Sequence, residues 1–138
     1  MEIAALVGDA PGWGAWMVRA AGLACLALAV LHCFFPRLFR WREQLPRVSR
    51  ANAGVMQVMN IVLTGCLLLF AAVLLVHTDA MITTALGRTL LGALALLWLL
   101  RAALQRPYFS AAGPAVTLGF ELYFVLTALM LAVPLLLG

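Results

Sequence analysis

The chain has 138 residues, of which 66% are hydrophobic and only 10% are charged. A soluble domain carries about 25% charged residues, so a water-soluble surface is excluded and most of the outside is expected to face lipid. The formal charge of +4 comes with nine basic residues that are all arginine. They lie beside hydrophobic runs, as topology markers do, and therefore do not indicate nucleic-acid binding.

Residues 1–12 form a short lead that carries Glu2 and Asp9. The lead lacks the basic n-region of a signal peptide, and an acid stands where a cation would be expected. We therefore expect this lead to be retained. The exclusive use of arginine is typical of a GC-rich bacterial genome.

Four long apolar runs follow, at residues 16–35, 54–76, 82–104 and 116–137. Each matches the ~20 residues that a helix needs to cross ~30 Å of hydrocarbon. Trp13 and Trp16 stand where an aromatic belt anchors a helix end, and Pro36 is expected to end the first helix. The sequence predicts an all-α polytopic membrane protein, a four-helix bundle that forms one integral domain over residues 1–138.

The connector between the first two runs, residues 36–52, is rich in arginine: Arg37, Arg40, Arg42, Arg47 and Arg50. Loops rich in arginine stay on the cytoplasmic side, where each basic side chain gains roughly 1 kcal/mol from anionic lipid head groups. Apolar residues recur along it at helical spacing: Leu38, Trp41, Leu45 and Val48. This predicts an amphipathic helix at the cytoplasmic membrane surface, which Pro46 would kink or divide.

The remaining loops agree with this orientation. Arg106 lies in the second inner loop, residues 106–114, whereas Asp79 lies in a very short outer turn at residues 77–79. We therefore predict that both termini lie outside the bacterial cytoplasmic membrane. Because the loops are short, the protein is expected to act within or at the membrane.

One polar cluster is predicted near the inner ends of the four helices. Its members are His32, Gln57, Asn60, Trp98, Arg101, Gln105 and Glu121. At 1.5 Å per residue, one polar group from each helix falls at a similar depth, and a charge at a helix centre costs about 2.5–3.5 kcal/mol on insertion. We expect the cluster to face the bundle interior, with an ion pair between Glu121 and Arg101 at its centre.

Two interpretations of this cluster remain open. It can be structural, with hydrogen bonds between helices that fix their register and each stabilise the bundle by ~0.6 kcal/mol. It can also line a pocket open to the cytoplasmic side, for a lipid head group, a quinone-like ring or a transported ion. Near the outer side, Arg19 and Arg88 can extend to head groups or pair with Asp79 or Asp9.

No residue pattern indicates a catalytic site, a metal site or a cofactor. Cys25, Cys33 and Cys66 lie in apolar runs without metal-ligand spacing and are expected to be small buried hydrophobes. His32 and His77 fall at opposite ends of their helices, too far apart to ligate one haem. Hydrolase, metalloprotease and nucleotide-binding motifs are absent from the sequence.

The W-x-x-R-x-x-x-Q segment from Trp98 to Gln105 ends the third run, and His32, Trp41 and Asn60 stand late in the first run, just after it and early in the second. In this pattern the chain resembles a group of small uncharacterised four-helix bacterial membrane proteins. The resemblance covers most of the chain and implies the fold and a role for the polar cluster, but no activity. Small multidrug-resistance transporters match poorly, because their essential glutamate lies in the first helix.

Three functions are compatible with these features. The first is a non-catalytic accessory or scaffold subunit of a larger membrane complex. The second is a small transporter or lipophilic-ligand carrier, oligomeric, that uses His32, Arg101 and Glu121. The third is a membrane redox protein or enzyme. The lack of a soluble domain or catalytic motif favours the first.

Small residues spaced for close helix contact also fit partner helices. They are Ala20 with Ala24, and Ala85 with Ala93. The expected partners are the bilayer itself, anionic head groups, and either other membrane subunits or further copies of the chain.

Overall fold

A computed structural model describes residues 10–137 of the chain. In order, its elements are α1 (Ala10–Leu38), α2 (Trp41–Gln44), η2 (Leu45–Arg47), α3 (Arg50–Val76), α4 (Thr78–Thr83), α5 (Ala85–Ala103), α6 (Gln105–Phe109), η3 (Ser110–Ala112) and α7 (Pro114–Leu137). The four long helices are long and apolar enough to cross a membrane, as predicted. The predicted N-terminal lead, with Glu2 and Asp9, lies outside the described residues.

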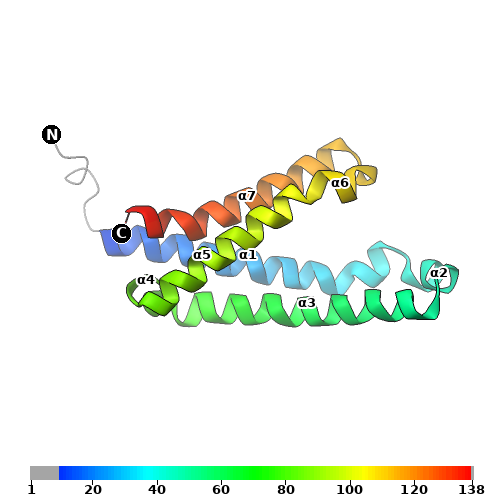
Figure 1. Ribbon diagram of the computed structural model, residues 1–138, viewed down its shortest axis with the longest axis horizontal. Coiled ribbons are helices and arrows are strands. Elements are labelled where there is room, and N and C mark those ends of the chain that lie inside the picture. The colour runs from blue at the N-terminus through cyan, green and yellow to red at the C-terminus, as the bar shows by residue number, and fades with distance from the viewer. Residues whose placement is uncertain (1–9, 138) are drawn as a thin grey trace.

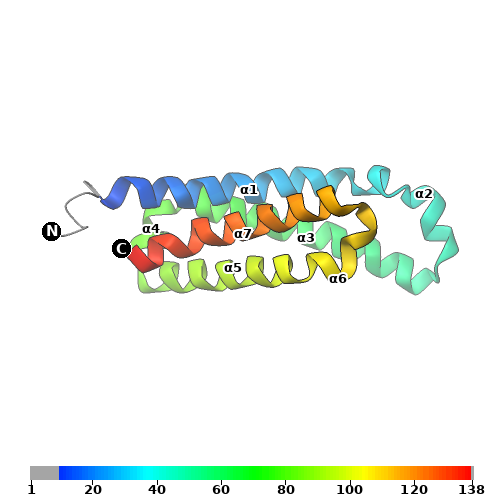
Figure 2. The same cartoon turned by 90° about the horizontal axis from the view of Figure 1, so that it is seen from above.

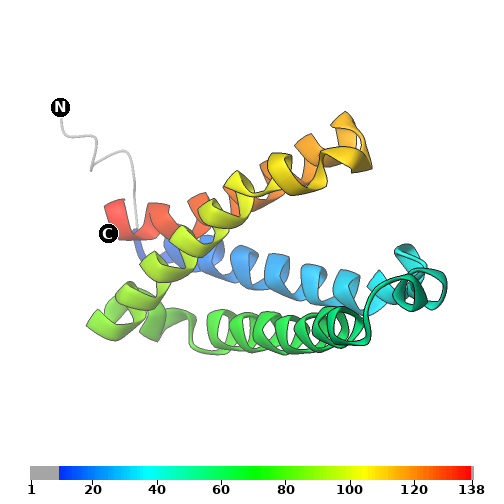
Figure 3. The ribbon, with the colours of Figure 1, turned by 45° about the vertical axis from the view of Figure 1, so that its right-hand side comes forward.

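The long helices form two hairpins (Figure 1). In the first hairpin α1 packs on α3, and in the second hairpin α5 packs on α7. Helix α7 also contacts α1 and lies between α1 and α5 (Figure 2). The hairpins meet at the end that holds α4, the α4 end, and diverge towards the end that holds α2 and α6, the connector end (Figure 3). The fold is therefore a V of two helix pairs.

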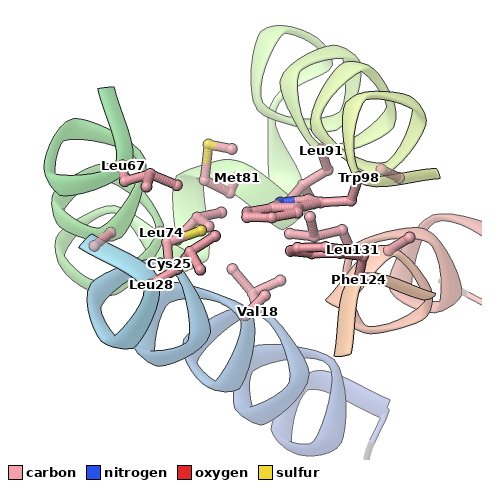
Figure 4. Close-up of a cluster of buried hydrophobic side chains, with 14 of the residues drawn as sticks. Val18, Cys25, Leu28, Leu67, Leu74, Met81, Leu91, Trp98, Phe124 and Leu131 are labelled. Atoms are coloured by element: carbon pink, nitrogen blue, oxygen red, sulfur yellow. The ribbon is translucent and has the colours of Figure 1, made fainter. Parts of the chain in front are cut away.

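Buried apolar side chains fill both hairpins and the seam near the α4 end (Figure 4). Between α1 and α3 they include Cys25, Leu28, Leu67 and Leu74; between α5 and α7 they include Leu91, Trp98, Phe124 and Leu131. Val18 from α1 and Met81 from α4 are also buried and complete this core. Lipid is as apolar as these side chains, so close van der Waals packing stabilises such contacts inside a membrane.

The outward faces of the long helices are apolar. Exposed side chains include Leu23 and Val30 on α1, Val58 and Ile61 on α3, Leu86 and Leu96 on α5, and Leu122 and Leu126 on α7. Soluble monomers rarely expose contiguous apolar patches larger than a few hundred Å². The exposed surface therefore agrees with four helices surrounded by lipid.

The end of α1 differs from the prediction, because the helix continues through Pro36 to Leu38. A proline has no N–H, so it leaves the carbonyl four residues earlier without its helical donor. That carbonyl belongs to His32, and Nδ2 of Asn60 in α3 donates to it at 3.1 Å. The neighbouring helix thus satisfies the backbone group that Pro36 leaves open, as happens with prolines inside membrane helices.

The connector is not one amphipathic helix. Arg40 adopts a left-handed conformation, with φ of 48°, between α1 and the four-residue α2. Pro46 then lies in the three-residue η2, so the chain is divided there, as one form of the prediction had it. The second connector turns at Gly113, whose φ of 97° suits glycine.

The predicted third span was wrong at its start. Residues up to Thr83 belong to the separate helix α4, which also replaces the predicted short turn at residues 77–79. Helix α5 begins at Ala85, where the side chain of Thr84 caps it by accepting from the N–H of Gly87 at 3.0 Å. A Cβ at Gly87 would lie 2.3 Å from the carbonyl oxygen of Ala80. Glycine at this position allows α5 to pack against the backbone of α4.

Two polar side chains, one at the α4 end and one in the middle of the bundle, donate to backbone carbonyls. Arg88 donates to the carbonyls of Ile82, at 3.4 Å, and Leu135, at 3.0 Å, instead of pairing with Asp79. Tyr123 in α7 donates to the carbonyl of Ala24 in α1 and so joins the two hairpins. The guanidinium of Arg19 lies 5.7 Å from the ring centre of Trp16.

Candidate functional site

The polar cluster lies at the connector end, where the hairpins diverge. Its first part joins α1 to α3 within the first hairpin. Nδ1 of His32 donates to Oδ1 of Asn60 at 3.1 Å, while Asn60 donates back to the His32 carbonyl. The His32 side chain is buried, and its ring stacks on Phe35 with centroids 4.1 Å apart. These two members of the cluster thus satisfy each other's hydrogen bonds.

The second part lies on the second hairpin, with Trp98 and Arg101 near the end of α5 and Gln105 at the first position of α6. Trp98 is 4% exposed and Gln105 only 2%. Trp98 Nε1, Arg101 Nη1 and Gln105 Oε1 are buried, and none has a hydrogen-bond partner among residues 10–137. One further such atom, Nε1 of Trp13, belongs to α1. A buried polar atom without a partner costs about 1–3 kcal/mol, so three on one hairpin require an explanation.

Two aromatic rings hold the guanidinium of Arg101. Its central carbon lies 4.4 Å from the ring centre of Phe124 and 4.7 Å from that of Phe109. Trp98 stacks on the same Phe124 with centroids 5.7 Å apart. Each cation–π contact supplies about 0.5–2 kcal/mol. The two parts of the cluster thus lie on different hairpins, His32 and Asn60 on α1 and α3 and Arg101 on α5.

The predicted ion pair between Glu121 and Arg101 was wrong. Oε2 of Glu121 accepts from Nε of Arg106 at 2.7 Å. The Arg106 side chain is 70% exposed, so the pair lies at the edge of the second hairpin. Helix α6 brings Arg106 over α7, whereas Arg101 turns to the aromatic rings. The basic residue at the centre of the cluster therefore has no carboxylate partner among the described residues.

A groove lies beside the cluster, between α6 and the first connector. Its volume is about 650 Å³, and it is lined by Phe35, Phe39, Trp41, Gln44, Leu45, Arg47, Val48, Met56 and Phe109. Phe109 comes from the second hairpin and every other lining residue from the first. One ring thus lines the groove and also covers Arg101, while Phe35 lines it and also covers His32.

Gln57 does not face the bundle interior as expected. Its side chain is exposed and lines, with Asn60, a second groove of about 520 Å³ beside Pro36 and Trp41. The arginines of the first connector are exposed: Arg37, Arg40, Arg42, Arg47 and Arg50. Nη1 of Arg40 lies 3.8 Å from Oε2 of Glu43. Their proposed contact with anionic lipid stays a prediction.

Sequence reasoning missed the aromatic residues of the site, above all Phe109 and Phe124. Phe124 follows Phe120 by one helical turn, and their stacked rings lie 6.0 Å apart. An aromatic at this spacing on the helix facing Arg101 was the available signal. Phe109 gave none, because its position depends on how α6 folds back over α5.

Other candidate groups lie apart from the cluster. His77 follows the last residue of α3, at the α4 end, so the two histidines lie at opposite ends of the bundle. Among residues 10–137 no three His, Cys, Asp or Glu side chains gather as a metal site would require. Cys25 is buried as predicted, whereas Cys33 is exposed.

Comparisons with protein-family models, curated proteins and solved structures find no match to this chain. Its function is therefore inferred from the geometry of the chain itself.

Proposed function

We propose that this protein is a small integral membrane carrier or binding protein for a lipophilic ligand, held by its polar part at the connector end. The observation that supports this most is the buried, unpartnered polar face of Trp98, Arg101 and Gln105. Two nitrogen donors and one amide oxygen, next to an aromatic groove, form the combination expected of a pocket for a mostly apolar molecule.

A structural role in hydrogen bonding between helices explains only part of the cluster. His32 and Asn60 satisfy each other, and a contact of this kind stabilises a membrane bundle by ~0.6 kcal/mol. The polar face of α5 and α6 makes no such contact, so it lowers the stability of the protein alone. Groups that cost stability in the unliganded protein are typical of functional sites.

The orientation that we propose places the connector end at the cytoplasmic face of the membrane. It rests on the five arginines of the first connector and on Arg106 in α6, since arginine-rich loops stay on that side. A ligand would then reach the groove from the cytoplasm or from the cytoplasmic leaflet.

The test is gentle detergent extraction of the native membrane, followed by mass spectrometry of the intact protein and of its organic extract. The proposal expects one lipophilic compound in stoichiometric amount with the wild-type chain. Gln105→Leu, which removes a buried unpartnered polar group, should lose that compound. Gln57→Leu is the matched control, because Gln57 is exposed outside this face, and it should retain the compound. A wild-type protein without a bound compound would contradict the proposal.

An accessory or scaffold subunit is the second candidate. Helix α3 is the least buried of the four long helices, and a Cβ added at its Gly65 would meet nothing within 4 Å. A partner helix could approach closely there. By contrast, Ala20 and Ala24 are partly buried, and the Ala24 carbonyl accepts from Tyr123, so they serve packing within the chain. Larger membrane proteins in stoichiometric amount after the same extraction would favour this candidate.

A further inference from the structure

Arg101 is the member of the site that determines what chemistry its ligand carries. It is a cation near the end of an apolar helix, and its Nη1 atom is buried without a partner. The acids among the described residues are used elsewhere or lie far away: Glu121 pairs with Arg106, Glu43 lies near Arg40, and Asp79 lies in α4. An anion is therefore the partner that the site lacks.

The groove indicates the rest of the ligand. Its lining is mostly apolar, with four aromatic side chains, Phe35, Phe39, Trp41 and Phe109, and three aliphatic ones; Gln44 and Arg47 from the first connector complete it. A volume of about 650 Å³ falls within the range of pockets for small molecules, roughly 300–1,000 Å³. It suits one compact apolar body.

We infer that the ligand is a lipophilic carboxylic acid, whose apolar body lies in the groove and whose carboxylate passes Phe109 to reach Arg101. This inference rests on the function proposed above and names its ligand class. The second donor is Nε1 of Trp98, which shares the ring of Phe124 with Arg101. Gln105 can turn its amide to offer either oxygen or nitrogen, so it can bond either form of the acid.

Phe109 separates the groove from Arg101. Its backbone is held, because Oγ1 of the buried Thr117 donates to the Phe109 carbonyl at 3.1 Å. Its side chain is 41% exposed and lies over the guanidinium of Arg101. A carboxylate would therefore reach Arg101 from the groove by rotation of this ring, without movement of α6.

The experiment compares 2-naphthoate with its neutral methyl ester, using the purified full chain in nanodiscs of zwitterionic lipid with empty nanodiscs subtracted. A charge-assisted bond to the half-buried Arg101 favours the acid by at least about tenfold in Kd. Arg101→Met should abolish this preference. Arg50→Gln removes the same charge at an exposed position at the start of α3 and should leave it unchanged.

Equal affinity of wild type for the acid and the ester would overturn the inference, whether or not Arg101→Met folds. Arg101→Lys, which keeps the charge, should keep a preference for the acid. Binding of phosphatidylglycerol without binding of 2-naphthoate would also overturn it. If the native extract contains a stoichiometric neutral compound, the proposed function stands and the carboxylate assignment fails. If neither the extract nor the probes show a ligand, both fail.

Discussion

The α4 end and the connector end of this bundle differ in the contacts that they contain. At the α4 end, Leu74, Leu91 and Leu131 are fully buried, and Gly87 lets α5 contact the backbone of α4. At the connector end, each hairpin is tied within itself, by His32 with Asn60 and by Arg106 with Glu121. Between the hairpins at that end lies a groove, and the second hairpin holds buried polar atoms without partners among residues 10–137.

This difference shows which contacts hold the chain together and which are available to a ligand. Close packing joins the hairpins at one end. At the other end the polar bonds stay within each hairpin and do not join it to its neighbour. The seam between the hairpins there is left without such bonds among residues 10–137.

The largest change is expected from opening the α4 end. In Gly87→Ala the new Cβ lies 2.3 Å from the Ala80 carbonyl oxygen and 2.5 Å from Cα of Met81. Neither backbone atom can move away cheaply, so the free energy of unfolding should fall by about 3 kcal/mol. Thermal unfolding in detergent measures this. Gly65→Ala is the control, because it meets nothing within 4 Å and should gain up to about 1 kcal/mol from helix propensity.

Breaking the tie within the first hairpin comes next. Asn60→Leu leaves two groups of His32 without a partner, its ring Nδ1 and its backbone carbonyl. The free energy of unfolding should fall by about 2 kcal/mol. Gln57→Leu, one turn away and exposed, should have no effect in the same assay. An equal effect of both substitutions would show that the tie does not carry the stability of this hairpin.

Removing an unpartnered polar group should raise the free energy of unfolding instead of lowering it. Gln105→Leu replaces an amide whose Oε1 is buried without a partner and should raise the stability of the ligand-free protein by about 1 kcal/mol. Before the ligand is stripped, wild type should be the more stable of the two, because a bound ligand stabilises the folded state. Destabilisation of the ligand-free protein would mean that the amide has a partner after all.

Among residues 10–137 one side-chain hydrogen bond joins the hairpins, and its loss should matter less. Tyr123→Phe removes only the bond to the Ala24 carbonyl and should cost ~0.6 kcal/mol. Spin labels at the exposed residues Leu38 and Tyr108 would report any widening of the connector end. A wider distribution of label distances in the variant would identify this bond as a limit on the opening.

The smallest effect is expected for Glu121, which the sequence placed in the central ion pair of the polar cluster. Glu121→Gln weakens a pair whose basic partner is 70% exposed, so stability should change by less than about 0.5 kcal/mol. Ligand retention after extraction should also stay as in wild type. Loss of the ligand in this variant would return Glu121 to the site.

Hydropathy and helical spacing predicted the four apolar helices and placed His32 and Asn60, which bond to each other, in one cluster. They could not predict which groups pair, because helical depth says nothing about the direction in which a side chain turns. Glu121 was predicted at the level of Arg101, yet α6 folds back and presents Arg106 instead. The sequence also offered no sign that Asn60 would replace the donor missing at Pro36, since that depends on the approach of α3 to α1.

The bond between His32 and Asn60 also bears on how the chain is made. Both residues belong to the first half of the sequence. The ribosome therefore synthesises His32 and Asn60 before any residue of α5 or α7. Domains and subdomains generally fold from the N-terminus as they emerge, and membrane helices insert before they associate. The first hairpin can thus settle in the bilayer as a finished unit, and the second hairpin docks onto it along α7.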